Sequence, residues 1–294
     1  MRKRWLWGGI VSLGILATLL AMVIPWMLSA PLHQVLQVSK AAEAGDCNPN
    51  TLTIASLNLA HGRSTGMHQM TQARGTIQKH LDQAGALLRA HQVDLVALQE
   101  VDHKAWWSHH IDQATHVAQA AQLPNVVGGA QVDAFGLRYG TAIAAKGQLS
   151  DAEAFAFSAG PFAPGKGFTV ARWDAGHGRT ATVVSLHFHF LSGARQRAQA
   201  EQLVATLEQL PRPLIVCGDF NASWAPLVER IASALDLNTW QIEDRTATLR
   251  YGGRIDWILV SKNLHIVAQE TLIDAPSDHA AIVATIAWNN DEQP

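Results

Sequence analysis

Polar side chains stand at the ends of several short apolar segments of this sequence, and each is a carboxylate, a carboxamide or an imidazole. The set consists of Asn58, Glu100, His187, Asp219, Asn221, Asp256, Asp278 and His279. Their neighbours should be buried, as in the segments LVALQE, VVSLHFHF and PLIVCGDFN. Polar groups that are buried without partners cost free energy, so we expect these side chains to meet one another or a metal ion.

The types of these side chains favour a hard cation. Carboxylate and carboxamide oxygens bind Mg²⁺, which keeps several waters and also binds substrate phosphate, and Mn²⁺ accepts the same ligands. The sequence has no HExxH motif and no paired-cysteine spacing that would favour zinc. Because Mg²⁺ in such sites commonly binds substrate phosphate as well, these residue types are compatible with a phosphate-containing substrate.

Each of these residues has a simpler explanation when taken alone. An Asp before a strand, such as Asp256, is often a turn or cap residue. His187 within an apolar strand is compatible with a hydrogen-bonded core histidine, and Glu100 with a salt-bridge partner. The combination at so many strand ends is what favours a shared site.

The elements that must position these residues alternate between apolar strands and amphipathic helices. Apolar residues at helical spacing predict helices over residues 71–91 and 112–122 and around Ala200 to Leu207. Strands are predicted over residues 51–59, 93–101, 141–145, 168–173, 182–189, 214–217, 255–260 and 280–288. The alternation predicts an α/β domain whose sheets are covered by helices.

The order of the motifs resembles that of a known superfamily. In chain order they are LNLAHG with Asn58, LQEV with Glu100, the His187 strand, GDFN with Asp219 and Asn221, RIDWI with Asp256, and SDH with Asp278 and His279. Over residues 51–288 the chain resembles the endonuclease/exonuclease/phosphatase (DNase-I-like) superfamily. The resemblance implies a four-layer α/β/β/α sandwich with the site at one end of two packed sheets.

The resemblance also implies roles at the metal. Glu100 would be the principal ligand, with Asn58 beside it and Asp278 as a supporting acid. The family often has Asn after the Gly of the Tyr139-Gly140 pair, where this chain has Thr141. Thr141 is therefore only a weak candidate for substrate binding.

The remaining residues would handle phosphate and water. His187 would donate to a phosphate oxygen, while Asp219 and Asn221 would orient the attacking water and the phosphate. Asp256 would hold His279, as the general base or as a stabiliser of the transition state. Whether Asp219 or His279 takes the proton of the water stays open at this stage.

The first residues predict a membrane anchor. A basic tail, residues 1–4 (MRKR), precedes an uncharged apolar run over residues 5–28, which is long enough to cross a bilayer as a helix. The basic tail should stay cytoplasmic, so the rest should lie outside the cytoplasm. A cleaved signal peptide, with an A-x-A-like site at Ala42 to Ala44, and a buried core helix are the alternatives.

The anchor divides the rest of the chain. Residues 29–50 read as a juxtamembrane linker, residues 51–289 as the catalytic domain and residues 290–294 as a polar tail. Trp106 and Trp107, after LQEVD, are either packed loop residues or side chains that insert among lipid headgroups. We do not expect a disulfide between Cys47 and Cys217. The sequence indicates no protein partner.

Charge and location rank the candidate substrates. The 22 Lys and Arg fall to 19 without the basic tail, against 24 Asp and Glu, so the remainder carries a net charge of −5. Such a charge weakly disfavours nucleic acids, whose binding depends on cationic contacts. The first hypothesis is therefore a membrane-anchored phosphodiesterase acting on lipid headgroups, since an anchor raises their local concentration. An extracytoplasmic nuclease is the second, and a non-catalytic binding module on the same fold is the third.

Overall fold

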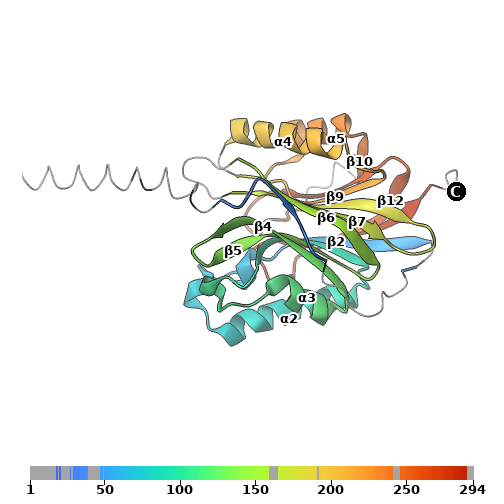
Figure 1. The fold of residues 1–294 in the computed structure, drawn as a ribbon. Helices are drawn as coiled ribbons and strands as arrows, with labels where there is room; N and C mark the ends of the chain where they lie inside the picture. The colour runs from blue at the N-terminus through green and yellow to red at the C-terminus, as the bar shows by residue number, and fades with distance from the viewer. Residues whose placement is uncertain are drawn as a thin grey trace, which may run out of the picture.

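Two mixed β-sheets pack face to face, and helices cover the outer face of each sheet (Figure 1). The structure is a computed structural model. It describes residues 29–38, 47–48, 50–158, 165–190, 192–240 and 246–289, with single positions at 18, 20 and 27. The order of layers is the α/β/β/α arrangement that the resemblance implied.

The first sheet has six strands in the order β12-β13-β2-β3-β5-β4. Its strands are β2 (Thr51–Asn58), β3 (Leu95–Asp102), β4 (Asn125–Ala134), β5 (Leu137–Ala145), β12 (Leu264–Leu272) and β13 (Ala281–Trp288). Strands β2 and β3 are parallel, and the other neighbours are antiparallel. Helices α2 (Arg74–Ala90) and α3 (Gln113–Ala121) pack on the outer face.

The second sheet has seven strands in the order β1-β6-β7-β8-β9-β11-β10. Its strands are β1 (His33–Val35), β6 (Gln148–Ala156), β7 (Gly167–Asp174), β8 (Thr180–His187), β9 (Leu214–Asp219), β10 (Leu237–Thr239) and β11 (Asp256–Ser261). Only β8 and β9 are parallel. Helices α4 (Gly193–Leu207) and α5 (Glu229–Ala234) pack on its outer face.

The core between the sheets determines where the polar strand ends meet. Alternate side chains of both sheets point inward, which is the period-two pattern of strands buried against each other. Examples are Ile54, Leu95 and Ile143 from one sheet and Trp173, Ile215 and Ile258 from the other. The parallel pairs β2–β3 and β8–β9 both end at the same edge of the domain. There, Nδ2 of Asn58 at the end of β2 lies 3.1 Å from Oδ2 of Asp219 at the end of β9.

The segment before β2 differs from the expected linker. Strand β1 pairs with β6, and Ser29 forms a bridge with Val132 of β4. The partly buried side chains of Leu36 and Val38 pack against the core between the sheets. Residues 29–38 are thus part of the folded domain, because β1 pairs with β6 and the side chains of Leu36 and Val38 pack against the core.

The predicted anchor over residues 5–28 lies almost wholly outside the described residues. Positions 18, 20 and 27 are helical. No helix in the described part of the chain combines the length and apolar character that crossing a bilayer requires. Cys47 and Cys217 are both buried.

Candidate active site

Asp219 lies at the centre of the polar side chains that end the strands. Its Oδ1 accepts a hydrogen bond of 2.8 Å from the backbone N–H of Asn221. Its Oδ2 accepts from Asn58 Nδ2 at 3.1 Å and lies 3.3 Å from His187 Nε2. Burial raises the pKa of Asp219, but His187, His279 and the Asn221 N–H outweigh burial and lower it. The buried carboxylate is therefore ionised at neutral pH.

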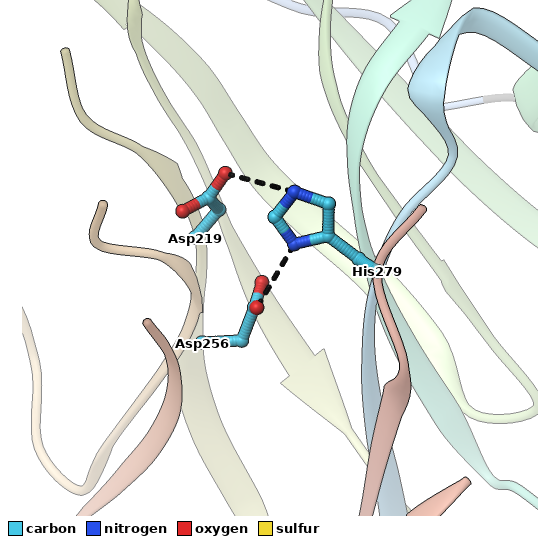
Figure 2. A group of neighbouring side chains, drawn as sticks. All are labelled: Asp219, Asp256 and His279. Atoms are coloured by element: carbon cyan, nitrogen blue, oxygen red, sulfur yellow. Dashed lines mark hydrogen bonds and ion pairs between the residues drawn. The ribbon is translucent and has the colours of Figure 1, made fainter. Parts of the chain in front are cut away.

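His279 is held by a second carboxylate (Figure 2). Its Nδ1 lies 2.9 Å from Asp256 Oδ2, and its Nε2 faces Asp219 Oδ2 at 3.9 Å. Burial lowers the pKa of His279, but Asp256 and then Asp219 outweigh burial and raise the pKa to about 10. His279 is thus an imidazolium at neutral pH, able to donate from Nε2 toward a substrate.

The end of β9 and the turn that follows it hold the Asp219 side chain in place. Gly218 has φ +154°, and a Cβ there would lie 2.1 Å from the carbonyl oxygen of Leu186, so only glycine fits between β8 and β9. Asn221 adopts a left-handed φ of 47°. Its Nδ2 donates to the carbonyl of Phe188 at 2.9 Å, while its backbone holds Asp219. The local backbone therefore fixes the positions of Asp219 and Asn221 relative to each other.

Glu100 reaches the site through an irregularity in β3. A β-bulge separates Gln99 from Val101, and Glu100 has φ 50°, which is rare for a residue other than glycine. A bulge re-aims a side chain out of the regular alternation of a strand. In this chain it turns the Glu100 carboxylate into a small pocket lined also by Tyr139 and His187.

Lys166 lies in the candidate site, although the sequence did not reveal it. Its ammonium donates to Glu100 Oε1 at 3.3 Å and lies 3.0 Å from Nε2 and 3.2 Å from Nδ1 of His187. Burial, and then Lys166, lower the pKa of His187. Nε2 of His187 also lies 3.3 Å from Asp219 Oδ2, so the ring stands between the Lys166 ammonium and the Asp219 carboxylate.

A second histidine–carboxylate pair lies on the other side of Glu100. His61 Nδ1 lies 2.7 Å from Asp102 Oδ1, and His61 Nε2 lies 3.7 Å from Glu100 Oε2. Trp107 Nε1 donates to Asp102 Oδ2 at 2.8 Å, and its ring stacks on Tyr139. Burial lowers the pKa of His61, but Asp102 and then Glu100 outweigh burial and raise it. Trp107 is therefore the packed residue of the tryptophan pair, while Trp106 is exposed.

Two candidates from the sequence have other partners in the structure. Asp278 Oδ2 accepts from Arg63 Nη2 at 2.7 Å, so its carboxylate is paired with a guanidinium. The Thr141 hydroxyl is fully buried and shares a 2.8 Å hydrogen bond with Thr169. Metal ligation by Asp278 and substrate binding by Thr141 stay predictions, and in this structure each side chain has another partner.

The donor set can hold a divalent cation. Asp219, Asp256 and His279 each offer one atom, and these atoms lie within 4.8 Å of one another. Protonated His279 has no lone pair for a metal, however, so the Glu100 side fits a cation better. The Lys166 ammonium already provides a positive charge in the Glu100 pocket. The free volume of this pocket is only about 10 Å³. Asn58 lies beside Asp219, but its Oδ1 already accepts a hydrogen bond from the Ala60 N–H at 2.9 Å.

A larger groove opens on the other side of His279. It encloses about 1060 Å³ between the loop 246–250, the loop 273–280 and helix α2. Its walls include Leu87 and Ile273, which are apolar, and Arg250 and His80, which are polar. A groove of this size can hold the group attached to a phosphate that His279 contacts.

A comparison with sequence families decides the relationship. The profile described as the endonuclease/exonuclease/phosphatase family matches residues 55–279, more than half of the chain. The chain belongs to this family. Members of the endonuclease/exonuclease/phosphatase family are generally hydrolytic and typically depend on a divalent metal. No functionally curated protein matches the sequence significantly.

Solved structures of the endonuclease/exonuclease/phosphatase family share the fold. A member from Bacteroides vulgatus has a TM-score of 0.66 and 18% identity, covering 81% of this chain and 99% of that chain. The human Nocturnin catalytic domain has a TM-score of 0.63 and 19% identity, covering 86% and 97%. A mannosyl-6-phosphatase from Bacteroides thetaiotaomicron has a TM-score of 0.59 and 18% identity, covering 81% and 100%. Similarity at this identity is evidence for the fold alone.

Proposed function

We propose that the chain is a membrane-anchored, extracytoplasmic, Mg²⁺-dependent phosphodiesterase that acts on lipid headgroups. The observation that carries the proposal is the contact set of Asp219. One buried carboxylate faces His279 at 3.9 Å and His187 at 3.3 Å, beside the Glu100 pocket. Such an arrangement supplies a proton acceptor and donors to phosphate within one cleft.

Each residue has a role that follows from its protonation state. Ionised Asp219 accepts the proton of the attacking water. The His279 imidazolium, oriented by Asp256, donates to the phosphate or to the leaving oxygen. His187 and Lys166 add donors on the Glu100 side. Mg²⁺, or Mn²⁺ in its place, bound at Glu100 would neutralise phosphate charge in the transition state.

Two features support a lipid headgroup as substrate. The apolar run of residues 5–28 would hold the site near a bilayer, where headgroups are concentrated. The groove beside His279 has apolar walls at Leu87 and Ile273 as well as polar ones. A groove of mixed character suits a phosphodiester that bears one apolar and one polar substituent.

The test is a headgroup-release assay. The full chain is reconstituted in liposomes of labelled phospholipids, with Mg²⁺ or with a chelator. We expect release of the phosphorylated headgroup, loss of release with chelator, and loss in Asp219→Asn. Absence of release from all common phospholipids would refute the lipid substrate.

An extracytoplasmic nuclease is the second candidate, and Arg250 and Tyr251 favour it. Arg250 lines the groove, and its guanidinium lies 5.8 Å from the ring centroid of its neighbour Tyr251, which is almost fully exposed. Arginine and an exposed aromatic ring together suit phosphate contact and base stacking. Plasmid nicking that falls steeply with salt, and that Tyr251→Ala weakens, would favour the nuclease over the lipid phosphodiesterase.

A further inference from the structure

The N-terminal segment joins the domain at the catalytic edge. Ser29 forms a bridge with Val132, and the Ala30 N–H donates to the Gln131 carbonyl at 3.2 Å. Gln131 also lines the small pocket that contains Glu100. The chain therefore enters the folded domain beside the pocket where the metal ligand lies.

This attachment leaves no free linker. The apolar run ends at Leu28, directly before Ser29. A free segment over residues 29–50 would span up to about 70 Å, at roughly 3.3 Å per residue. Since Ser29 is already paired with β4, the edge that carries Glu100 is held close to whatever contains residues 5–28.

Exposed apolar side chains gather at the same edge. We call Met67, Met70, Trp106 and Phe135 the apolar rim; Met67 is 97% exposed and Phe135 72%. Single exposed apolar residues are common, whereas several together indicate an interaction surface.

Backbone and side-chain contacts join the members of the apolar rim. The Trp106 N–H donates to the Gly136 carbonyl at 3.1 Å, which places Trp106 against the β4–β5 turn that carries Phe135. The loop with Met67 and Met70 meets the Trp106 loop, where His109 Nε2 lies 2.8 Å from the Gln72 carbonyl. The turn follows Val132 by three residues, so the apolar rim lies beside the entry of the N-terminal segment.

A cationic side chain accompanies the apolar rim. Lys104 is exposed on the Trp106 loop, whereas Arg138, just after the β4–β5 turn, lies 3.5 Å from Asp133 Oδ2. Apolar side chains beside an exposed lysine match the interface of a bilayer, where acyl chains meet anionic headgroups. Together with the adjacent apolar run, this chemistry selects a lipid surface as the occupant.

We propose that the apolar rim inserts into the headgroup layer of the membrane that holds residues 5–28, so that the Glu100 pocket opens directly onto the lipid surface. The proposal rests on the membrane anchoring in the proposed function. It adds an orientation: the catalytic edge faces the bilayer, and the far ends of the strands, near Val267, face away from it. Val267 lies at the bulge of β12, close to the pairing of Leu264 with Trp288.

A site-specific fluorescent probe tests this orientation. Cys47 and Cys217 are buried, so a maleimide reagent should label only an introduced cysteine in the folded chain. The full chain is mixed with phosphatidylcholine–phosphatidylglycerol vesicles, with an environment-sensitive label at Phe135→Cys or, as control, at Val267→Cys. Val267 is also exposed, at 48%. Flotation verifies vesicle binding, and nitroxide-labelled lipids report depth.

We expect the Phe135→Cys label to emit at shorter wavelength and to be quenched several-fold more strongly than the Val267→Cys label. Equal quenching of the two labels would overturn the orientation. A chain that stays in the aqueous fraction would overturn it as well.

Activity gives an independent readout. Phe135→Asp should lower hydrolysis of a vesicle-embedded phosphodiester roughly tenfold, the factor expected when a large apolar side chain loses its burial. Hydrolysis of soluble bis(p-nitrophenyl) phosphate should stay unchanged, and Val267→Asp should change neither. Phe135 has φ 53°, which Asp tolerates better than Phe, so the variant should fold. An equal loss on both substrates would contradict the proposal.

The two proposals fail separately. If the Phe135→Cys label is quenched but no lipid is hydrolysed, docking stands and the headgroup substrate is withdrawn. If lipid is hydrolysed but the label is not quenched, the headgroup substrate stands and docking is withdrawn.

Discussion

His279 lies between two carboxylates that act on it differently. Asp256 contacts its Nδ1 at 2.9 Å and fixes the orientation of the ring, whereas Asp219 faces Nε2 at 3.9 Å. An imidazolium cannot accept a proton. We therefore propose that Asp219 takes the proton of the attacking water.

The first prediction concerns alkaline pH. The pKa of His279 is raised to about 10 from 6.5, so its charge stabilises the folded state fully below pH 6.5, and this stabilisation is lost as the pH rises through about 10. We expect kcat to fall over the same range. Asp256→Asn should move this decline toward neutral pH, which a pH–rate profile measures. An unchanged profile in the variant would contradict the assignment.

The second prediction concerns Asp219. Asp219→Asn keeps the shape of the side chain but removes the proton acceptor, so kcat should fall about 10²- to 10⁴-fold. Circular dichroism should show an intact fold. The matched control is Thr141→Val, in which a hydroxyl that faces Thr169 is lost: KM should not change. A KM increase in the control would restore Thr141 as a substrate contact.

At the scale of elements, strand β3 is irregular at Glu100, the residue that it contributes to the site. A left-handed φ of 50° in a residue with a Cβ costs free energy, and such strain persists where function requires it. The bulge that produces it also interrupts the pairing with β5 between Gln99 and Val101. The position of the carboxylate thus depends on an element that is locally less stable than a regular strand.

The third prediction follows from this strain. Glu100→Asn and Glu100→Gln both remove the charge, but only Asn adopts a left-handed φ readily. Both variants should raise the metal concentration needed for activity. Glu100→Asn should be more stable than Glu100→Gln by about 0.5–1 kcal/mol in urea unfolding. Equal stability would show that φ at this position carries no strain.

The sequence predicted the central strands and helices well, because their periodicity is strong. The helix expected over residues 71–91 begins at Arg74, since Gln69–Thr71 forms a separate short turn. Strands β1, β4, β6, β10 and β12 and helix α5 were not predicted. Strands β1 and β10 have only three residues each and α5 only six, too few to show a periodic pattern. Strand β4 contains the pair Gly128–Gly129, and β6 and β12 carry many polar residues on an exposed face, so their composition does not indicate a strand.

The site was predictable where a polar residue lies at or near either end of a buried strand. The structure brings together five such residues, namely Asn58, Glu100, Asp219, Asp256 and His279. His61 was visible within LNLAHG, three residues after Asn58, but nothing marked it as a partner of Glu100. Lys166 follows no apolar segment, and only tertiary structure reveals its contact.

At the scale of the molecule, the site joins distant parts of the chain. The Ser277 hydroxyl donates to the Asn58 carbonyl at 2.6 Å and accepts from the His279 N–H at 3.1 Å. Arg63, after β2, pairs with Asp278, before β13, at 2.7 Å. The loop that carries His279 is therefore positioned by the first strand of the same sheet.

The fourth prediction tests this connection. Ser277→Ala leaves the buried N–H of His279 without its acceptor, which should cost about 1–3 kcal/mol in urea unfolding. It should also lower kcat, because His279 loses part of its positioning. The control is Ser150→Ala, at an exposed hydroxyl beside Asp151, which should change stability by less than about 0.5 kcal/mol. Similar effects of both changes would contradict the connection.

Strand β13 lies between β12 and β2, and it is the last strand of the described chain. Strand β2 is made early in synthesis, so it gains this neighbour only after residues 281–288 have been made. A polypeptide that stops before His279 lacks both the imidazole and this neighbour. We therefore expect it to leave one edge of β2 unpaired and Asp219 without the imidazole that faces it.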